Sequence, residues 1–373
     1  MRTLVIDTRN PKDRKKFIEF PYQIYRGNQQ WTPALLRDMN LVMDRKRHPY
    51  YQHSDAQFLI AESEGSVIGR IAVLHNRNYC QFRQEMTGFF YYFDCIEDRQ
   101  AASMLFDAAI QWAKARNLNR LIGPKGFLRS SGMGVLIEGF EYLPAMGIPY
   151  NYPYYADLLE SYGFSKKLDH YSGYMVRKDN VDERVHKAAE LIRKRGNFQV
   201  RAFRDKKEIR QFLPQVKVIQ EEAFVDNPNF YPSTEAEIAL IGNTMIQAAR
   251  PQMIKLIFKG DELAGFIISY PNINQAIQKT GGRIYPFGWI RLLRAQATTT
   301  IADVNGVGLL PKYQGMGANA LLYAELEKTL RQYRQFEKAE FVQVNEDNFR
   351  SRSDMEKAGV HFYKTHRTYQ INF

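Results

Sequence analysis

The feature that most constrains the fold of this chain is an internal repeat with a constant spacing. Around Gly69 and again around Gly265, two alternating apolar segments flank a tight turn, which predicts a β-hairpin in each place. The sequence around Gly163 likewise resembles the sequence around Gly359. Both glycine pairs are 196 positions apart, as 265 − 69 and 359 − 163 show. Two separate blocks with one offset indicate that a single fold occurs twice in tandem.

The length of the chain agrees with two domains. A chain of 373 residues suits two domains of about 150–200 residues each. We expect an N-terminal domain over residues 1–178 and a C-terminal domain over residues 179–373, with the boundary near Lys178-Asp179-Asn180. A helix from about residue 181 to residue 195 then leads into the second copy.

The most specific local motif lies in the second copy, where residues 307–323 read VGLLPKYQGMGANALLY. This order predicts the end of a strand, a short glycine-containing turn and the start of a helix. The first turn of a helix presents free backbone N–H groups and the positive end of the helix dipole, which together bind anions such as a pyrophosphate. The motif has no Gly-Lys-Ser/Thr and only two glycines in the turn, so it is neither a Walker loop nor a dinucleotide fingerprint.

This turn resembles the Gln/Arg-x-x-Gly-x-Gly/Ala turn of the GCN5-related N-acetyltransferases (GNAT proteins). Gln314 and Gly317 are in register with that pattern, whereas Asn319 replaces its last small residue.

A second GNAT-like motif follows near the C-terminus. Asn348, Glu356, Lys357 and Gly359 match in register, but Met355 occupies the position of the family's frequent catalytic tyrosine. The resemblance extends more loosely over nearly the whole chain, to bacterial tandem acetyltransferase proteins known mainly by their fold.

The resemblance implies an α+β protein with two tandem GNAT-like domains, each a mixed, mostly antiparallel twisted sheet flanked by helices. It implies an N-acyltransferase that moves an acyl group, here expected to be acetyl, from acyl-CoA to an amine in the cleft between the domains. Acetyl-CoA or another acyl-CoA is the expected co-substrate, and no metal is expected. The expected acyl-CoA-binding residues are Val307, Leu309, Gln314, Gly315, Met316, Gly317, Ala318, Asn319 and Asn348.

The candidate catalytic residues are Asp303, Glu346 and Tyr363, with His361 as an alternative to Tyr363. Asp303 is the only acid on the predicted strand 299–309, where it would accept the proton of the amine or would only solvate the strand end. Glu346 follows the next strand, where it would orient the amine or belong to a helix cap. Tyr363 would protonate the leaving thiolate in place of the missing tyrosine, as would His361.

The first copy lacks the anion-binding turn. Only Glu97-Asp98 separate its aromatic-rich strand at 88–96 from its helix at 99–116, and these carboxylates would repel a pyrophosphate. We therefore expect no nucleotide at this place in the N-terminal domain. The glycine- and aromatic-rich stretch 123–155 predicts a long ordered loop or a pair of short strands, with either a functional or a packing role.

Composition excludes some classes and leaves others open. No apolar run approaches a membrane span, the N-terminus has no signal sequence, and the 2 cysteines form no disulfide framework, so we expect a cytoplasmic protein. The net charge of +12 suits acyl-CoA, an anionic membrane or nucleic acid. No nucleic-acid-binding signature accompanies it, and nucleic acid is not an expected partner. The sequence does not indicate the oligomeric state.

Residues 285–294, YPFGWIRLLR, combine large apolar side chains with two arginines. They predict either a buried helical turn or an apolar, basic-edged flap that would suit a long acyl chain or an amphiphilic lipid amine at a membrane. Two further alternatives to acetyl transfer remain open: a non-catalytic GNAT-fold binding protein, and an aminoacyl-tRNA-dependent ligase of the peptidoglycan-bridge type.

Overall fold

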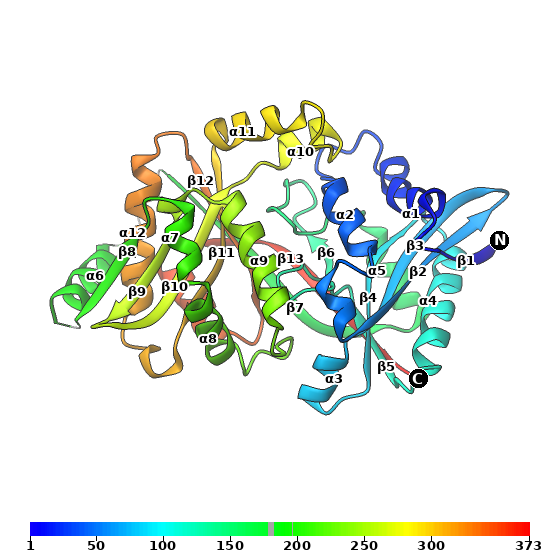
Figure 1. The fold of residues 1–373 in the computed structure, drawn as a ribbon, viewed down its shortest axis with the longest axis horizontal. Helices are drawn as coiled ribbons and strands as arrows, with labels where there is room; N and C mark the ends of the chain where they lie inside the picture. Colours follow the sequence, from blue (N-terminus) through cyan, green and yellow to red (C-terminus); the bar gives the residue numbers. More distant parts are fainter. Residues whose placement is uncertain (178–182, 196) are drawn as a thin grey trace. The chain divides into compact units, whose positions relative to one another are not determined.

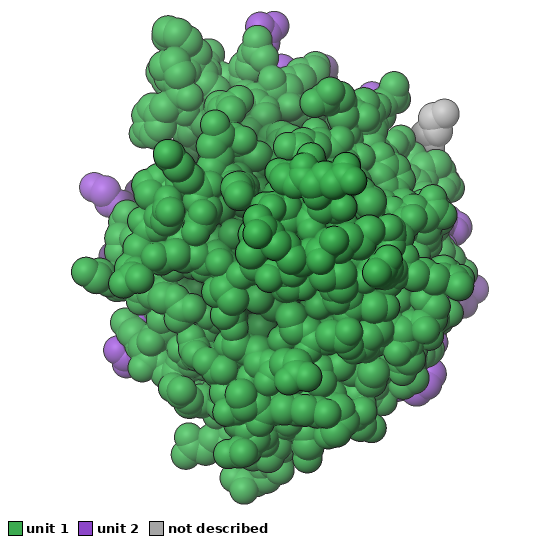
Figure 2. Space-filling view, turned by 90° about the vertical axis from the view of Figure 1, so that its right-hand side faces the viewer, with its two compact units in different colours: residues 1–170, 274–293, 364–373 green, residues 171–273, 294–363 purple. Residues whose placement is uncertain are grey.

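A computed structural model describes residues 1–177, 183–195 and 197–373, and in these stretches no helix is long and apolar enough to cross a membrane. The chain forms two compact units (Figure 2). The first comprises residues 1–170, 274–293 and 364–373, and the second comprises residues 171–273 and 294–363. The predicted boundary at Lys178-Asp179-Asn180 lies outside the described residues and stays a prediction.

Each unit contains strands and helices in the order shown in Figure 1. The first unit holds β1 (Arg2–Val5), α1 (Pro11–Ile24), α2 (Leu36–Met43), η1 (Pro49–Gln52), β2 (Asp55–Ser63), β3 (Ser66–His75), α3 (Arg77–Arg83), β4 (Thr87–Cys95), α4 (Arg99–Lys114), β5 (Arg120–Gly123), β6 (Val135–Glu138), α5 (Tyr154–Tyr162) and α10 (Asn274–Thr280). The second holds α6 (Glu183–Arg195), β8 (Phe198–Ala202), α7 (Lys206–Gln211), α8 (Leu213–Ala223), α9 (Glu235–Ala248), η2 (Pro251–Met253), β9 (Ile254–Lys259), β10 (Glu262–Pro271), β11 (Ile301–Leu309), η3 (Pro311–Tyr313), α12 (Ala318–Gln332), β12 (Lys338–Asn345) and α13 (Phe349–Lys357). Three elements contribute residues to both units: β7 (Ser165–Val176), α11 (Gly288–Thr298) and β13 (His361–Asn372).

The two units repeat one strand pattern. In the first, β1 to β4 are antiparallel neighbours, and β5 then joins β4 in parallel. In the second, β8 to β11 are antiparallel neighbours, and β12 joins β11 in parallel. A parallel pair needs a crossover connection, and α4 and α12 supply it. The predicted α+β class with mixed, mostly antiparallel sheets is confirmed.

The repeated glycines occupy equivalent positions for physical reasons. Gly69 on β3 lies opposite Cys95, and Gly265 on β10 lies opposite Leu309 at the end of the corresponding strand. A Cβ on Gly265 would lie 2.5 Å from the carbonyl oxygen of Gly308, so only glycine allows this strand approach. Gly163 and Gly359 follow α5 and α13 with φ values of 112° and 94°, the left-handed geometry that ends many helices.

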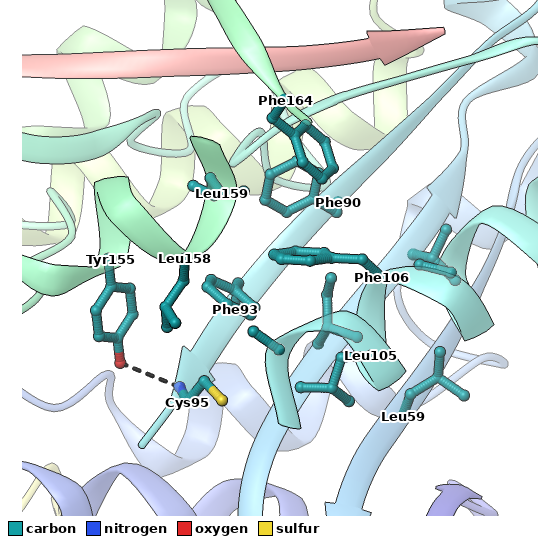
Figure 3. Packing of buried hydrophobic residues seen from close by; sticks show 14 of the residues in the cluster. Leu59, Phe90, Phe93, Cys95, Leu105, Phe106, Tyr155, Leu158, Leu159 and Phe164 are labelled. Carbon is teal, nitrogen blue, oxygen red and sulfur yellow. Dashed lines mark hydrogen bonds between the residues drawn. The ribbon is translucent and has the colours of Figure 1, made fainter. Parts of the chain in front are cut away.

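The core of the first unit is aromatic, and Figure 3 shows part of it. The rings of Phe93 and Phe106 lie 4.7 Å apart between β4 and α4. The Tyr155 hydroxyl accepts a hydrogen bond from the Cys95 backbone N–H, which ties α5 to the end of β4. The predicted long loop of this unit contains β6 and an isolated bridge between Lys125 and Met133, so it holds the short strands that the glycine-rich sequence suggested.

The last ten residues belong to the first unit. Residues 369–372 of β13 pair with β5, and Arg367 holds Asp169 through two hydrogen bonds of 2.8 and 3.0 Å. Residues 274–293, which lie between β10 and β11 in sequence, also belong to that unit. The buried helical turn considered for residues 285–294 is wrong, because none of these residues is buried and α11 has no buried residue.

Candidate active site

The predicted anion-binding turn has the expected local structure. β11 ends at Leu309, η3 follows, and α12 begins at Ala318. Gln314 turns back to donate from Nε2 to the Leu309 carbonyl over 3.1 Å, which braces the turn against the strand. Gly315 and Gly317 have φ values of 78° and 82°, so both adopt the left-handed conformation that glycine reaches without strain.

The start of α12 leaves its N–H groups available. Gly317 is the N-cap residue and has no side chain to bond the first helical turn. In the first unit, by contrast, Asp98 caps α4 by accepting hydrogen bonds from the backbone N–H groups of Gln100 and Ala101. The 15-residue helix α12 therefore presents an uncapped positive end, which suits a phosphate, whereas α4 presents a carboxylate.

Two side chains near the turn are already engaged. Lys312 Nζ lies 2.5 Å from Glu262 Oε1, and the Tyr313 hydroxyl donates to the other oxygen of the same carboxylate over 2.6 Å. Hydrogen bonds from Lys312 and Tyr313 hold the pKa of Glu262 below its usual range. Asn319, the departure from the family pattern, donates from Nδ2 to Asp354 on α13. Its side chain thus fixes α12 to α13.

β11 and β12 pair over only the first part of each strand. The two strands pair in parallel over Ile301–Val304 and Lys338–Phe341, and this pairing ends there although both strands continue. Opposite β10, the register shifts between Val304 and Val307, where Gly306 adopts a φ of 126°. This bulge turns the backbone of the strand just before Leu309.

A polar group at the start of β11 surrounds the candidate base. Asp303 is fully buried, lies opposite Tyr270 on β10 and accepts a hydrogen bond of 3.0 Å from Asn272 Nδ2. Asn305 donates to the Tyr270 hydroxyl over 2.5 Å. Burial, together with the charge of Asp303, raises the pKa of Tyr270, so its phenol stays protonated at neutral pH. We call Tyr270, Asn272, Asp303 and Asn305 the polar strand cluster.

An apolar pocket lies on the same face of this sheet. Phe266, Ile268 and Tyr270 alternate along β10 and therefore point to one side. Phe266 and Ile268 line a pocket of about 40 Å³ between the sheet and α7, α8 and α9. A Cβ on Gly308 would lie 2.8 Å from the Phe266 ring, so β11 runs directly beside this aromatic wall. The polar strand cluster and the apolar pocket thus share β10.

The other predicted residues come from other segments of the second unit. Glu346 is half-buried after β12, and Asn348 caps α13 by accepting from the Ser351 N–H over 3.1 Å. Tyr363 on β13 packs edge-on against Tyr174, and its hydroxyl accepts a hydrogen bond from Lys338. Met355 is buried in the core of the second unit.

Several polar residues of this site were not predicted from the sequence. Asn272 bonds to Asp303, Tyr270 lies opposite Asp303 on β10, and Asn305 bonds to Tyr270. Buried Glu340 lies opposite Asp303 on β12. The two-residue spacing of Asp303 and Asn305 places both on one strand face and could have indicated Asn305. The other neighbours of Asp303 come from the end of β10 and from β12, which the local sequence does not specify. Among residues 1–177, 183–195 and 197–373, no group of three or more His, Cys, Asp or Glu could hold a metal ion.

Comparison with known proteins gives the fold, and a family match for part of the chain. Residues 216–360 match the sequence profile described as "Acetyltransferase (GNAT) family". A solved tandem GNAT protein from the clavulanic acid biosynthesis pathway superposes with a TM-score of 0.57, at 11% identity, over 100% of this chain and 98% of that one. The chain is a tandem GNAT-fold protein. This confirms the predicted tandem GNAT fold.

Two curated relatives match this tandem GNAT-fold protein over more than nine-tenths of their length. Protein YghO of Escherichia coli is 28% identical over 97% of this chain and 93% of the relative. A bacterial ceramide synthase of Caulobacter vibrioides is 25% identical over 98% of this chain and 96% of the relative. The GNAT family match implies an acyl-CoA co-substrate, and it leaves the acyl group open.

Proposed function

We propose that this protein is a CoA-dependent N-acyltransferase that transfers a long-chain acyl group to the amine of an amphiphilic lipid. The observation that carries the proposal is that the uncapped turn at Gly317 follows β11, and that β10, which pairs with β11, lines an apolar pocket. The name of the Caulobacter relative supports a lipid amine as acceptor. Acetyl transfer to a small amine, our expectation from the sequence, has no comparable support.

The acyl-CoA would bind with its pyrophosphate at the N–H groups of Gly317, Ala318 and Asn319. Its pantetheine arm would run along Val307 and Leu309, beyond the residues over which β11 pairs with β12. The apolar chain would then extend along Phe266 toward the pocket beneath α8 and α9. Since the pocket has a volume of about 40 Å³, a long chain requires these helices to move outward.

The chemistry needs one base, one oxyanion donor and one acid. The amine nitrogen attacks the thioester carbonyl, the C–N bond forms, and the C–S bond then breaks. In this proposal Asp303, directly or through water, takes the proton lost by the amine, and a backbone N–H near Leu309 stabilises the oxyanion. The leaving thiolate takes a proton from Tyr363 or from water, and Glu346 orients the amine.

The test compares chain lengths and acceptors. Purified protein is incubated with hexadecanoyl-CoA or acetyl-CoA and with sphinganine or spermidine, and amide formation is measured by mass spectrometry. We expect the rate with hexadecanoyl-CoA and sphinganine to exceed every other pairing by at least about tenfold, a difference of about 1.4 kcal/mol in transition-state binding. Faster acetylation of spermidine would overturn the proposal. Tight acyl-CoA binding without turnover on any amine would show a binding protein.

Filling the pocket tests where the chain lies. Met245 on α9 lines the pocket and is partly exposed, so Met245→Trp adds volume there with limited strain. We expect the preference for hexadecanoyl-CoA over octanoyl-CoA to fall by about tenfold, while acetyl-CoA binding stays unchanged. Thr244→Trp, on an exposed position of the same helix, is the matched control and should leave the preference intact.

A further inference from the structure

A basic pocket lies between α1, α2 and the segment that precedes α11, all within the first unit. It has a volume of about 360 Å³, which is large enough for a small polar ligand. Its lining includes four cationic side chains, Arg14, Lys15, Arg26 and Arg283, and one carboxylate, Glu19. The pocket therefore carries a net charge of +3 from its lining, as 4 − 1.

Three of these cations are not neutralised by the protein. Lys15 Nζ lies 3.9 Å from Glu19, but within the described parts of the chain Arg14, Arg26 and Arg283 form no ion pair. The Nε of Arg14 is buried and has no hydrogen-bond partner among the described residues. A guanidinium in this state favours a ligand with several acceptor oxygens, and a phosphate matches its geometry.

The wall that carries Arg283 is fixed to the rest of the first unit. The Tyr22 hydroxyl donates to the Gly281 carbonyl over 2.9 Å, and the Leu36 N–H donates to the Gly282 carbonyl over 3.0 Å. Gly282 has a φ of 72°, and its Cα lies so close to the Ala34 carbonyl that a Cβ would not fit. Arg283 is thus held against α1 and α2 in the folded unit.

Directly after Arg283 the chain exposes a row of large apolar side chains. Tyr285 and Phe287 are 80% and 73% exposed, and Trp289, Ile290 and Leu293 on α11 are also exposed. Gly288 brings the start of α11 against the Arg283 carbonyl, where a Cβ would not fit. The apolar row is therefore coupled to the pocket over a few residues. Aromatic side chains beside arginines are typical of the boundary between lipid headgroups and acyl chains.

We propose that the basic pocket binds the phosphate of an anionic phospholipid while residues 285–293 enter the outer part of the bilayer. The occupant is a bilayer surface, because a soluble phosphate would have no use for the exposed apolar row. The net charge of +12 agrees with attraction to such a surface. The proposal does not rest on the acyl-transfer site in the second unit, and it would also bring an amphiphilic substrate to the enzyme.

The test is sedimentation of the full-length protein with lipid vesicles, without acyl-CoA. One vesicle type is phosphatidylcholine alone, and the other adds phosphatidylglycerol. Wild type is expected to bind the anionic vesicles, and Arg14→Gln/Arg283→Gln to bind them at least about tenfold more weakly. Phe287→Ser/Trp289→Ser should weaken binding to a similar extent. Lys46→Gln/Arg47→Gln removes the same charge from exposed residues outside the pocket and should stay close to wild type.

The other outcomes would overturn the proposal. Equal loss in the control and pocket variants would show attraction by net charge alone. Binding of inorganic phosphate or glycerol phosphate to wild type, without vesicle binding, would assign the pocket to a soluble anion. Absence of vesicle binding by wild type would remove the site. Circular dichroism and acyl-CoA titration of each variant separate these results from unfolding and from failure of the proposed acyl transfer.

Discussion

At the scale of single residues, Gly315 and Gly317 have the same left-handed backbone conformation, so any other residue would be strained at either position. The two positions differ in their surroundings. A Cβ on Gly317 would lie 3.0 Å from Ile192, whereas a Cβ on Gly315 would contact nothing within 4 Å. Alanine in the left-handed region costs about 1–2 kcal/mol at either place. We expect Gly317→Ala to weaken acyl-CoA binding by at least about tenfold, because the start of α12 must also shift. Gly315→Ala should lose clearly less in calorimetric titration, and equal losses would assign the effect to strain alone.

His366 is a second residue with a measurable consequence. It is fully buried, its Nε2 lies 3.1 Å from the Pro149 carbonyl, and burial lowers its pKa to about 3. The unfolded chain binds a proton near pH 6.5 that the folded chain does not, so stability falls as pH falls from about 6.5 toward 3. The expected loss of unfolding free energy between pH 7 and 5 is about 2 kcal/mol. His366→Gln should remove this part of the slope in urea titrations, and an unchanged slope would contradict it.

At the scale of elements, the starts of α4 and α12 show how two copies of one fold diverge. Asp98 caps α4, and Asp98→Ala should lower the unfolding free energy by about 1 kcal/mol, measured by urea denaturation. The same substitution should leave acyl-CoA binding unchanged at one site per chain, because, of these two helices, α12 has the uncapped glycine start. A second acyl-CoA site that is present in wild type and lost in Asp98→Ala, or that appears only in Asp98→Ala, would contradict this.

At the scale of the whole molecule, the last strand stabilises the unit that contains the N-terminus. Tyr369 is fully buried in the core of the first unit and donates a hydrogen bond to Glu160 over 2.9 Å. Tyr369→Ala should cost about 3–5 kcal/mol, as large-to-small changes in cores do. Hydrogen exchange should speed up in β2 to β4, far earlier in the sequence. Phe373→Ala, at a partly buried terminal ring, is the control, and faster exchange confined to the second unit would contradict this assignment.

The sequence by itself determined the features that depend on near neighbours. Alternating apolar residues, the glycines that end helices and the glycines of the turn near Gln314 impose local φ values and side-chain directions. These sufficed for the duplicated α+β fold, for the strand–turn–helix at residues 307–323 and for the lack of that turn in the first copy. Asp303 was placed correctly on β11, although its catalytic role stays a prediction.

The tertiary structure decided which distant segments meet. Asn319 contacts Asp354, Asp303 gains Tyr270 and Asn272 as neighbours, and residues 274–293 complete a basic pocket on the first unit. No local pattern specifies such pairs, because strand register and helix packing bring together residues far apart in the chain. The local turn could therefore be predicted from sequence, whereas the surroundings of the candidate base and the proposed lipid site depend on the fold.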